Sequence, residues 1–176
     1  VTYDFSDRKE TVDRSVIKNW LTKDENDDLV LDKAVIANYI SELAKKYDTV
    51  GTERTFSTYD NQEITVSGGN YGWVIDQEKE TDALYQDIMD KKTEVREPVY
   101  EQEAQSRNTN DIGYSYIEID LTRQRMVLYQ NGSPIVDTGF AASSSTPTGV
   151  YRLGDKQEAA SVDFWMPFTD KLGIYG

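Results

Sequence analysis

A serine and a lysine stand three positions apart in this chain, as Ser15 and Lys18. Penicillin-binding enzymes use this S-x-x-K spacing on a helix for a serine nucleophile and the lysine beside it. Neither the S-D-N nor the K-T-G partner motif is present, and the intervening Val16 and Ile17 belong to an apolar stripe. The pattern therefore favours a structural helix turn over a nucleophile.

A second candidate is the acidic segment "TKDENDDLVLD". Asp24, Asn26 and Asp28 alternate as the first ligands of an EF-hand calcium loop would. The pattern then fails, because Leu29 stands where the loop needs glycine and Val35 where it needs a bidentate glutamate. We expect a solvated connection between two helices and no metal site.

The composition excludes several kinds of chemistry. The 176 residues contain no cysteine and no histidine, so the chain itself holds no disulfide, thiolate nucleophile, cysteine zinc site or imidazole base. None of its 32 acidic residues forms an evident pair for glycoside hydrolysis. The net charge of -13, with no basic run, argues against nucleic-acid binding.

The closing segment, "FWMPFTDKLGIYG", concentrates aromatics, a Met-Pro pair and two glycines in residues 164–176. Such a composition suits the wall of a pocket. It also suits the edge of a β-sandwich core, since aromatics on strands more often pack in a core. The residues alone leave both interpretations open.

Helices are predicted in the first half of the chain by apolar residues on one helical face. One stripe covers residues 12–21, a second covers residues 35–47 with Asp32 as its N-cap, and a third covers residues 81–89. No apolar run approaches the length of a membrane span, and no signal peptide is recognisable. The protein is then either cytosolic or has an N-terminal export segment outside these residues.

Strands are predicted by alternation of apolar and polar residues. Residues 53–75 read as a hairpin that turns at Asp60-Asn61, and the glycines 68, 69 and 72 read as a turn with positive φ rather than a phosphate cradle. Residues 116–139 read as strands joined at Asn131-Gly132, a strong hairpin signal. A turn and a further strand are expected in "TPTGVYRLGD".

A polar stretch at residues 101–112 predicts a domain boundary. We expect an α+β domain over residues 1–110 and a β-rich, sandwich-like part over residues 111–176.

The β-rich part resembles the start of the L,D-transpeptidase (YkuD) catalytic domain. The resemblance rests on "YIEIDLTRQRMVLYQNG", "STPTGVYRL" and "DFWMPFTDKLGIYG" in that order. The earlier "LDKAVIANYISELAKKYDTVGTERTFST" and "VSGGNYGWVID" are similar to the peptidoglycan-binding domain that precedes such catalytic domains in Gram-positive bacteria. Together the similarity covers nearly the whole chain.

The resemblance implies a peptidoglycan cross-linking enzyme that works through a cysteine acyl-enzyme. A histidine is expected shortly after the closing segment and the cysteine later still, so the 176 residues would stop short of both. We therefore assign no catalytic residue and expect the chain to be inactive alone. Its β-part would hold only the first strands of a sandwich and expose an apolar face.

Trp165, Met166 and Tyr175 are the candidate walls of the substrate cleft, placed there by the resemblance. The implied partners are peptidoglycan stem peptides and β-lactams of the carbapenem class, and no cofactor or metal is expected. The implied location is the outer face of the membrane or the cell wall, with an N-terminal anchor outside these residues.

The sequence departs from the family at two points. A longer, substrate-facing insertion is usual between the positions of Ser161 and Val162, and "FAASSSTPTG" is short and lacks the usual glycine before Thr146. Either the chain is naturally shortened there or the protein holds further residues. An intact mass well above 20.1 kDa would show that the protein holds further residues.

A rival interpretation stays open: a non-catalytic peptidoglycan-binding or cell-wall spacer protein. It would need only the first domain, where Tyr59, Tyr71 and Trp73 could stack on sugar faces or could simply pack in the core.

Overall fold

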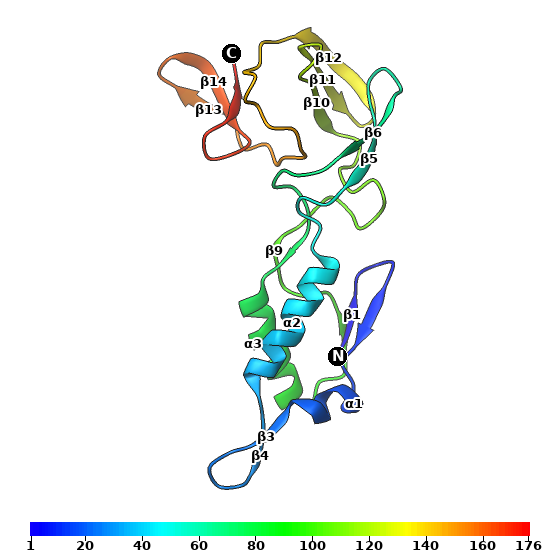
Figure 1. Ribbon diagram of the computed structural model, residues 1–176, viewed down its shortest axis with the longest axis vertical. Helices are drawn as coiled ribbons and strands as arrows, with labels where there is room; N and C mark the ends of the chain where they lie inside the picture. Colours follow the sequence, from blue (N-terminus) through cyan, green and yellow to red (C-terminus); the bar gives the residue numbers. More distant parts are fainter. The chain divides into compact units, whose positions relative to one another are not determined.

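The computed structural model describes residues 1–176, which divide into two compact units. The first unit comprises Val1–Thr49 and Gly72–Asp111, and the second comprises Val50–Tyr71 and Ile112–Gly176 (Figure 1). Residues 50–71, which the sequence-based division places in the first domain, thus belong to the second unit. They do so because Phe56 packs edge-on against Tyr116, with ring centroids 5.5 Å apart.

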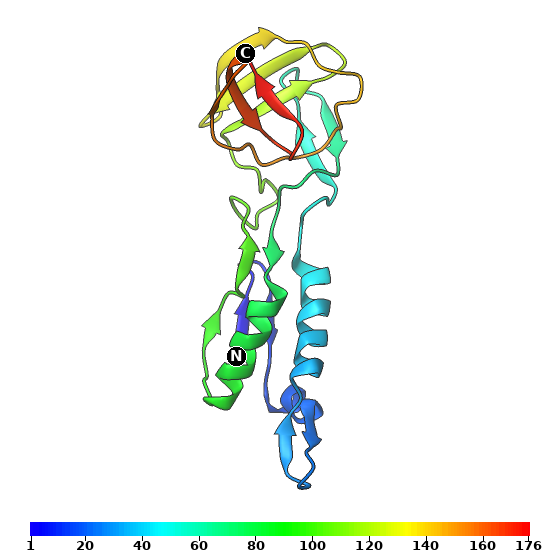
Figure 2. The same cartoon turned by 90° about the vertical axis from the view of Figure 1, so that its left-hand side faces the viewer.

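The first unit has two main helices, α2 (Lys33–Tyr47) and α3 (Gln77–Met89), which pack side by side (Figure 2). Short strands complete it in three sheets, ordered β2-β1-β8, β3-β4 and β7-β9. The remaining elements are β1 (Thr2–Asp4), β2 (Lys9–Thr11), α1 (Arg14–Ile17), the 3-10 turn η1 (Lys18–Trp20), β3 (Leu21–Lys23), β4 (Leu29–Leu31), β7 (Val74–Ile75), β8 (Val95–Arg96) and β9 (Tyr100–Gln102).

The second and third predicted helices are confirmed. Asp32 caps α2 by accepting the amide of Ala34 at 2.9 Å, and the predicted stripe of α2 faces the core. The core of the first unit consists of Tyr3, Phe5, Val12, Trp20, Ile36, Ile40, Leu43, Ala44, Tyr47, Ile75 and Leu84. Burial of these side chains is the main force that holds the unit together.

The prediction of one helix over residues 12–21 is wrong in its extent. Asp13 caps a helix of four residues, η1 follows, and Leu21 is already extended and paired with Leu31. The segment expected to be an acidic connection is the hairpin β3-β4. Its cross-strand pairing outweighs the helical spacing of the apolar residues before it.

The second unit consists of strands (Figure 1). Its strands form three sheets, ordered β10-β11-β12, β13-β14-β15 and β5-β6. The bounds are β5 (Arg54–Ser57), β6 (Glu63–Val66), β10 (Tyr116–Asp120), β11 (Arg125–Gln130), β12 (Ser133–Gly139), β13 (Gln157–Ala159), β14 (Val162–Pro167) and β15 (Gly173–Tyr175). The α+β first unit and the β-rich second unit confirm the predicted fold class.

Both predicted hairpins of the second unit are confirmed. β5 pairs with β6 from Arg54↔Val66 to Ser57↔Glu63, and β11 pairs with β12 across Asn131-Gly132. Asn131 and Gly132 have φ of 49° and 80°, the left-handed values that a tight two-residue hairpin turn requires.

The second unit encloses few side chains. Arg54, Glu118 and Val127 are its only buried residues in the described chain, and β12 is exposed along its whole length, including Ile135 and Val136. The expected strand in "TPTGVYRLGD" is reduced to one bridge, between Val150 and Gly69. The second unit therefore leaves apolar side chains of β12 exposed to solvent. None of the helices has the length and apolar character needed to cross a membrane.

Candidate functional site

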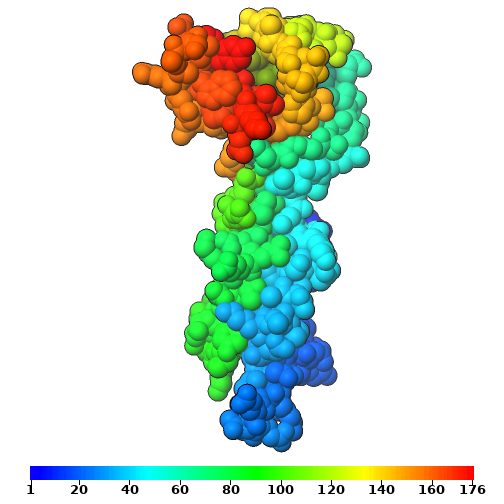
Figure 3. Space-filling model, turned by 60° about the vertical axis from the view of Figure 1, so that its left-hand side comes forward, coloured from blue at the N-terminus to red at the C-terminus, as the bar shows by residue number.

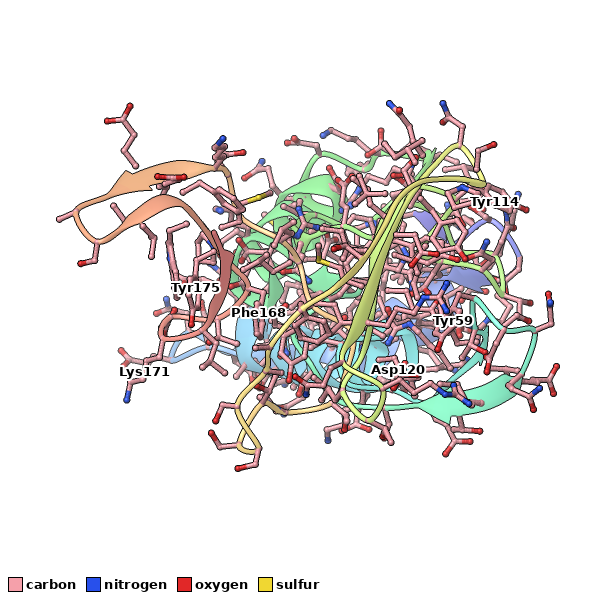
Figure 4. The ribbon with its side chains drawn as sticks, turned by 90° about the horizontal axis from the view of Figure 1, so that it is seen from above. Tyr59, Tyr114, Asp120, Phe168, Lys171 and Tyr175 are labelled. Atoms are coloured by element: carbon pink, nitrogen blue, oxygen red, sulfur yellow. The ribbon has the colours of Figure 1, made fainter.

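The candidate site lies on the strands β14 and β15, which carry all three of the predicted cleft residues. We call residues 162–175 the aromatic hairpin. Trp165 pairs with Tyr175 across the two strands, and their rings stack with centroids 6.1 Å apart at 23°. Tyr175 is 63% exposed (Figure 4), and the C-terminal strands, orange to red, form part of the surface in Figure 3. Tyr175 thus offers an aromatic face to solvent, with the half-buried Trp165 ring beside it.

Gly173 explains where the Trp165 ring lies. A Cβ atom at Gly173 would come within 2.7 Å of two carbons of the indole ring, so only glycine lets the ring lie across β15. The indole thereby lies over the backbone of the neighbouring strand.

Met166 does not join the other two predicted residues. It pairs with Ile174 in the register of β14 and β15, and successive side chains of a strand point to opposite faces. Trp165 and Tyr175 therefore share one face of the hairpin, and Met166 lies on the other.

The turn of the aromatic hairpin is fixed by the segments around it. The Pro167 carbonyl accepts the Gly154 amide at 2.6 Å, and the Phe168 carbonyl accepts the Asn70 side-chain amide at 2.8 Å. The Phe168 amide closes the turn by donating to the Leu172 carbonyl at 2.9 Å, and the Tyr151 ring meets Phe168 edge-on at 5.2 Å. The hairpin is thus held in place from several sides at its turn.

A polar cluster, which sequence reasoning missed, lies apart from the aromatic hairpin, between β10 and the turn of the β5-β6 hairpin. Glu118 is 8% exposed and its Oε1 accepts the Tyr59 amide at 3.0 Å, while its Oε2 is buried without a hydrogen-bond partner. Burial raises the pKa of Glu118, and the nearby carboxylates of Asp60 and Asp120 raise it further.

The rim of this cluster is fully paired. The Tyr59 hydroxyl donates to Asp120 at 3.3 Å (Figure 4), and the Arg123 guanidinium donates to Asp60 at 2.9 Å. The sequence signal that could have indicated this cluster is the spacing E-x-D of Glu118 and Asp120 on β10, because residues two apart on a strand share a face. The cluster holds the hairpin turn against β10, and no group of three or more metal-ligating side chains occurs in the chain.

The three aromatics of the rival interpretation are engaged in packing. Trp73 is 7% exposed, its indole nitrogen donates to the Ser106 carbonyl at 2.9 Å, and the Arg107 guanidinium lies 4.4 Å from its ring centroid. The Tyr59 ring faces Arg125 at 4.4 Å, and the Tyr71 ring has Arg54 at 5.8 Å. Trp73 therefore has no free face on which a sugar could stack.

The two patterns that the sequence disfavoured have structural roles. The Ser15 hydroxyl donates to the carboxylate of Asp13, the N-cap of α1, at 2.6 Å. Asp24 accepts the amides of Asn26 and Asp28 at 2.8 and 3.0 Å within the β3-β4 turn. Both sets of side chains serve the local backbone.

Comparison with known proteins matches both parts of the chain. Residues 1–96 match the family described as "Putative peptidoglycan binding domain", and residues 114–173 match the L,D-transpeptidase catalytic domain, YkuD. No curated protein sequence matches.

Two solved structures are similar over 99% of this chain, each with a TM-score of 0.70. One is the Ldtfm–avibactam carbamoyl enzyme, with 29% identity over 74% of that chain. The other is a cysteine-to-serine mutant of the Enterococcus faecium L,D-transpeptidase, with 28% identity over 76% of that chain.

Proposed function

The chain belongs to the L,D-transpeptidase family, with a peptidoglycan binding domain ahead of the catalytic domain, and on that premise we propose that the aromatic hairpin forms one wall of the stem-peptide cleft. Its enzyme class is that of a peptidoglycan cross-linking transpeptidase. The observation that carries the proposal is the stacking of the half-buried Trp165 ring on the exposed Tyr175 ring.

The chemistry of the class defines what such a wall must do. A thiolate attacks the carbonyl between the L- and D-centres of a stem peptide, and the thioester forms as the D-residue leaves with its amine protonated. The amine of a second stem then attacks the thioester, forms the cross-link and releases the thiol. The chain supplies no thiol or imidazole, so its contribution is to bind and orient the stem and exclude water.

The aromatic hairpin suits an extended peptide in two ways. The Trp165 and Tyr175 rings can cover the apolar methyl and methylene groups of a stem peptide. β15 is also the edge of the sheet β13-β14-β15, and an edge strand can pair with an extended peptide through main-chain hydrogen bonds.

The proposal is tested by titrating the 176-residue chain with a synthetic stem tetrapeptide and measuring the dissociation constant by calorimetry. Trp165→Ala should weaken binding about ten-fold, since losing a large, half-buried apolar contact costs roughly 1–2 kcal/mol. Tyr114→Ala is the matched control, because Tyr114 is a 69% exposed aromatic of the same unit outside the hairpin. Equal affinity of Trp165→Ala and the unaltered chain, or no binding by the unaltered chain, would contradict the proposal.

Further properties of the complete enzyme follow from the family and are part of the same proposal. Met166 would line the cleft only from the opposite face of the hairpin. The complete enzyme would also bind β-lactams of the carbapenem class and act outside the membrane, held by an N-terminal anchor. The sequence domains would be residues 1–110 and 111–176, although residues 50–71 fold with the second unit.

A further inference from the structure

Residues 67–71, Ser-Gly-Gly-Asn-Tyr, lie within the range that matches the peptidoglycan binding domain, yet they fold with the second unit. We call this segment the brace. It runs beside the segment around Val150, with which it forms a parallel bridge at Gly69. Residues that match the peptidoglycan binding domain are therefore part of the second folded unit, which otherwise matches the catalytic domain.

The backbone of the brace comes unusually close to its partner. The Val150 amide donates to the Gly68 carbonyl, and the Tyr71 amide donates to the Val150 carbonyl, both at 3.1 Å. Gly69 has φ of +89°, and a Cβ there would lie 1.9 Å from the Val150 carbonyl oxygen. The glycines read from the sequence as a turn thus have a second purpose, which is to allow this close approach.

Asn70 extends the brace to the aromatic hairpin. Its Oδ1 accepts the Arg152 amide and its Nδ2 donates to the Phe168 carbonyl, both at 2.8 Å. Phe168 opens the turn between β14 and β15, directly after Pro167, which pairs with the Gly173 that lies under the Trp165 ring. One side chain therefore joins the segment 150–152 to the end of the strand that carries Trp165.

We infer that Asn70 is a positioning residue for the stem-peptide cleft: it fixes the aromatic hairpin against the segment 150–152 and so sets where Trp165 and Tyr175 meet a substrate. The role of Asn70 in substrate binding rests on the function proposed above. Its role in holding the aromatic hairpin against the segment 150–152 rests only on its two hydrogen bonds. The peptidoglycan binding sequence would then contribute directly to the geometry of the catalytic unit.

The experiment uses the 176-residue chain labelled with 5-fluorotryptophan, which gives one ¹⁹F resonance each for Trp20, Trp73 and Trp165. Asn70→Ala should shift or broaden the Trp165 resonance alone, because the other two tryptophans lie in the first unit. The Arg152 amide should exchange about five-fold faster once its acceptor is removed, and affinity for the stem tetrapeptide should fall about five-fold. Unchanged Trp20 and Trp73 signals show that the first unit is still folded.

Two further variants separate bracing from a general loss of structure. Asn70→Asp keeps an acceptor for the Arg152 amide but loses the donor to Phe168, so Arg152 exchange should stay slow while the Trp165 signal moves. Gln62→Ala, an exposed amide in the β5-β6 turn, should change none of the three readouts.

The inference is overturned if Asn70→Ala leaves the Trp165 resonance and the Arg152 exchange unchanged. It is also overturned if the variant binds the stem peptide as tightly as the unaltered chain does. Failure of the unaltered chain to bind the peptide would instead overturn the function proposed above, whatever the variants do to the Trp165 signal.

Discussion

Glu80 in α3 joins three elements of the first unit through a buried carboxylate. The side chain is 0% exposed and accepts hydrogen bonds from the Tyr3 hydroxyl and, at 2.7 Å, from the Val99 amide. Arg96 of β8 donates to both of its oxygens, at 2.7 and 2.9 Å. Glu80 thereby links α3 to β1 and β8.

Glu80→Ala should destabilise the first unit severely. The change leaves the half-buried Arg96 guanidinium without its main partner and the Tyr3 hydroxyl and Val99 amide without acceptors. Removing one partner of a buried ion pair costs about 3–5 kcal/mol, against a total stability of about 5–15 kcal/mol for a domain. At roughly 4–8 °C for each kcal/mol in a domain of this size, the melting temperature should fall by roughly 12–40 °C.

Urea unfolding followed by circular dichroism measures the loss. Glu78→Ala is the matched control, because Glu78 is an exposed residue in the first turn of the same helix and should change stability by less than about 1 kcal/mol. The double variant Glu80→Met, Arg96→Met should recover much of the loss, since apolar pairs often replace buried ion pairs at little cost. A Glu80→Ala effect no larger than that of Glu78→Ala would contradict this role of the buried Glu80 carboxylate.

Three other predictions concern the second unit and the chemistry. Glu118→Gln should raise stability by about 1 kcal/mol at pH 7 and not at pH 3, because the ionised carboxylate carries a buried, unpartnered oxygen. The sign follows from the raised pKa: the unaltered protein loses stability as pH rises above the usual 4.5 of a glutamate, and the variant does not. Incubation with a carbapenem should leave the intact mass at 20.1 kDa, since no thiol is present. Residues 113–176 expressed alone should bind a hydrophobic dye or aggregate, because β12 exposes Ile135 and Val136 on an open edge.

An equal gain for Glu118→Gln at both pH values would contradict burial of the charge as its cause. A mass increase equal to the carbapenem would show a nucleophile other than cysteine. Monodisperse material that unfolds cooperatively would contradict the predicted aggregation of residues 113–176.

Local patterns in the sequence predicted the elements whose stabilising contacts are local or strongly periodic. α2 was predictable because its apolar stripe spans four turns and Asp32 supplies an N-cap. The β11-β12 hairpin was predictable because Asn131-Gly132 demands left-handed backbone at two successive residues. In both cases the signal lies within a few residues of the structure it specifies.

Contacts between distant segments were not predictable in the same way. β1 pairs in parallel with β8, Thr2 opposite Val95, and strands of two or three residues carry too little alternation to be recognised. The transfer of residues 50–71 to the second unit depends on Phe56 meeting Tyr116, sixty residues later in the chain. Trp165 and Tyr175 were identified as candidates through the family resemblance of the closing segment, whereas the bond from Asn70 to Phe168 spans 98 residues and leaves no local signal.

The most direct test of the central claim is a titration of the ¹⁵N-labelled 176-residue chain with the stem tetrapeptide, followed by amide chemical shifts. The largest changes should fall on residues 162–175, with Trp165 and Tyr175 among them. Changes confined to Val1–Thr49 and Gly72–Asp111 would contradict it and favour a protein that binds peptidoglycan only through its first unit.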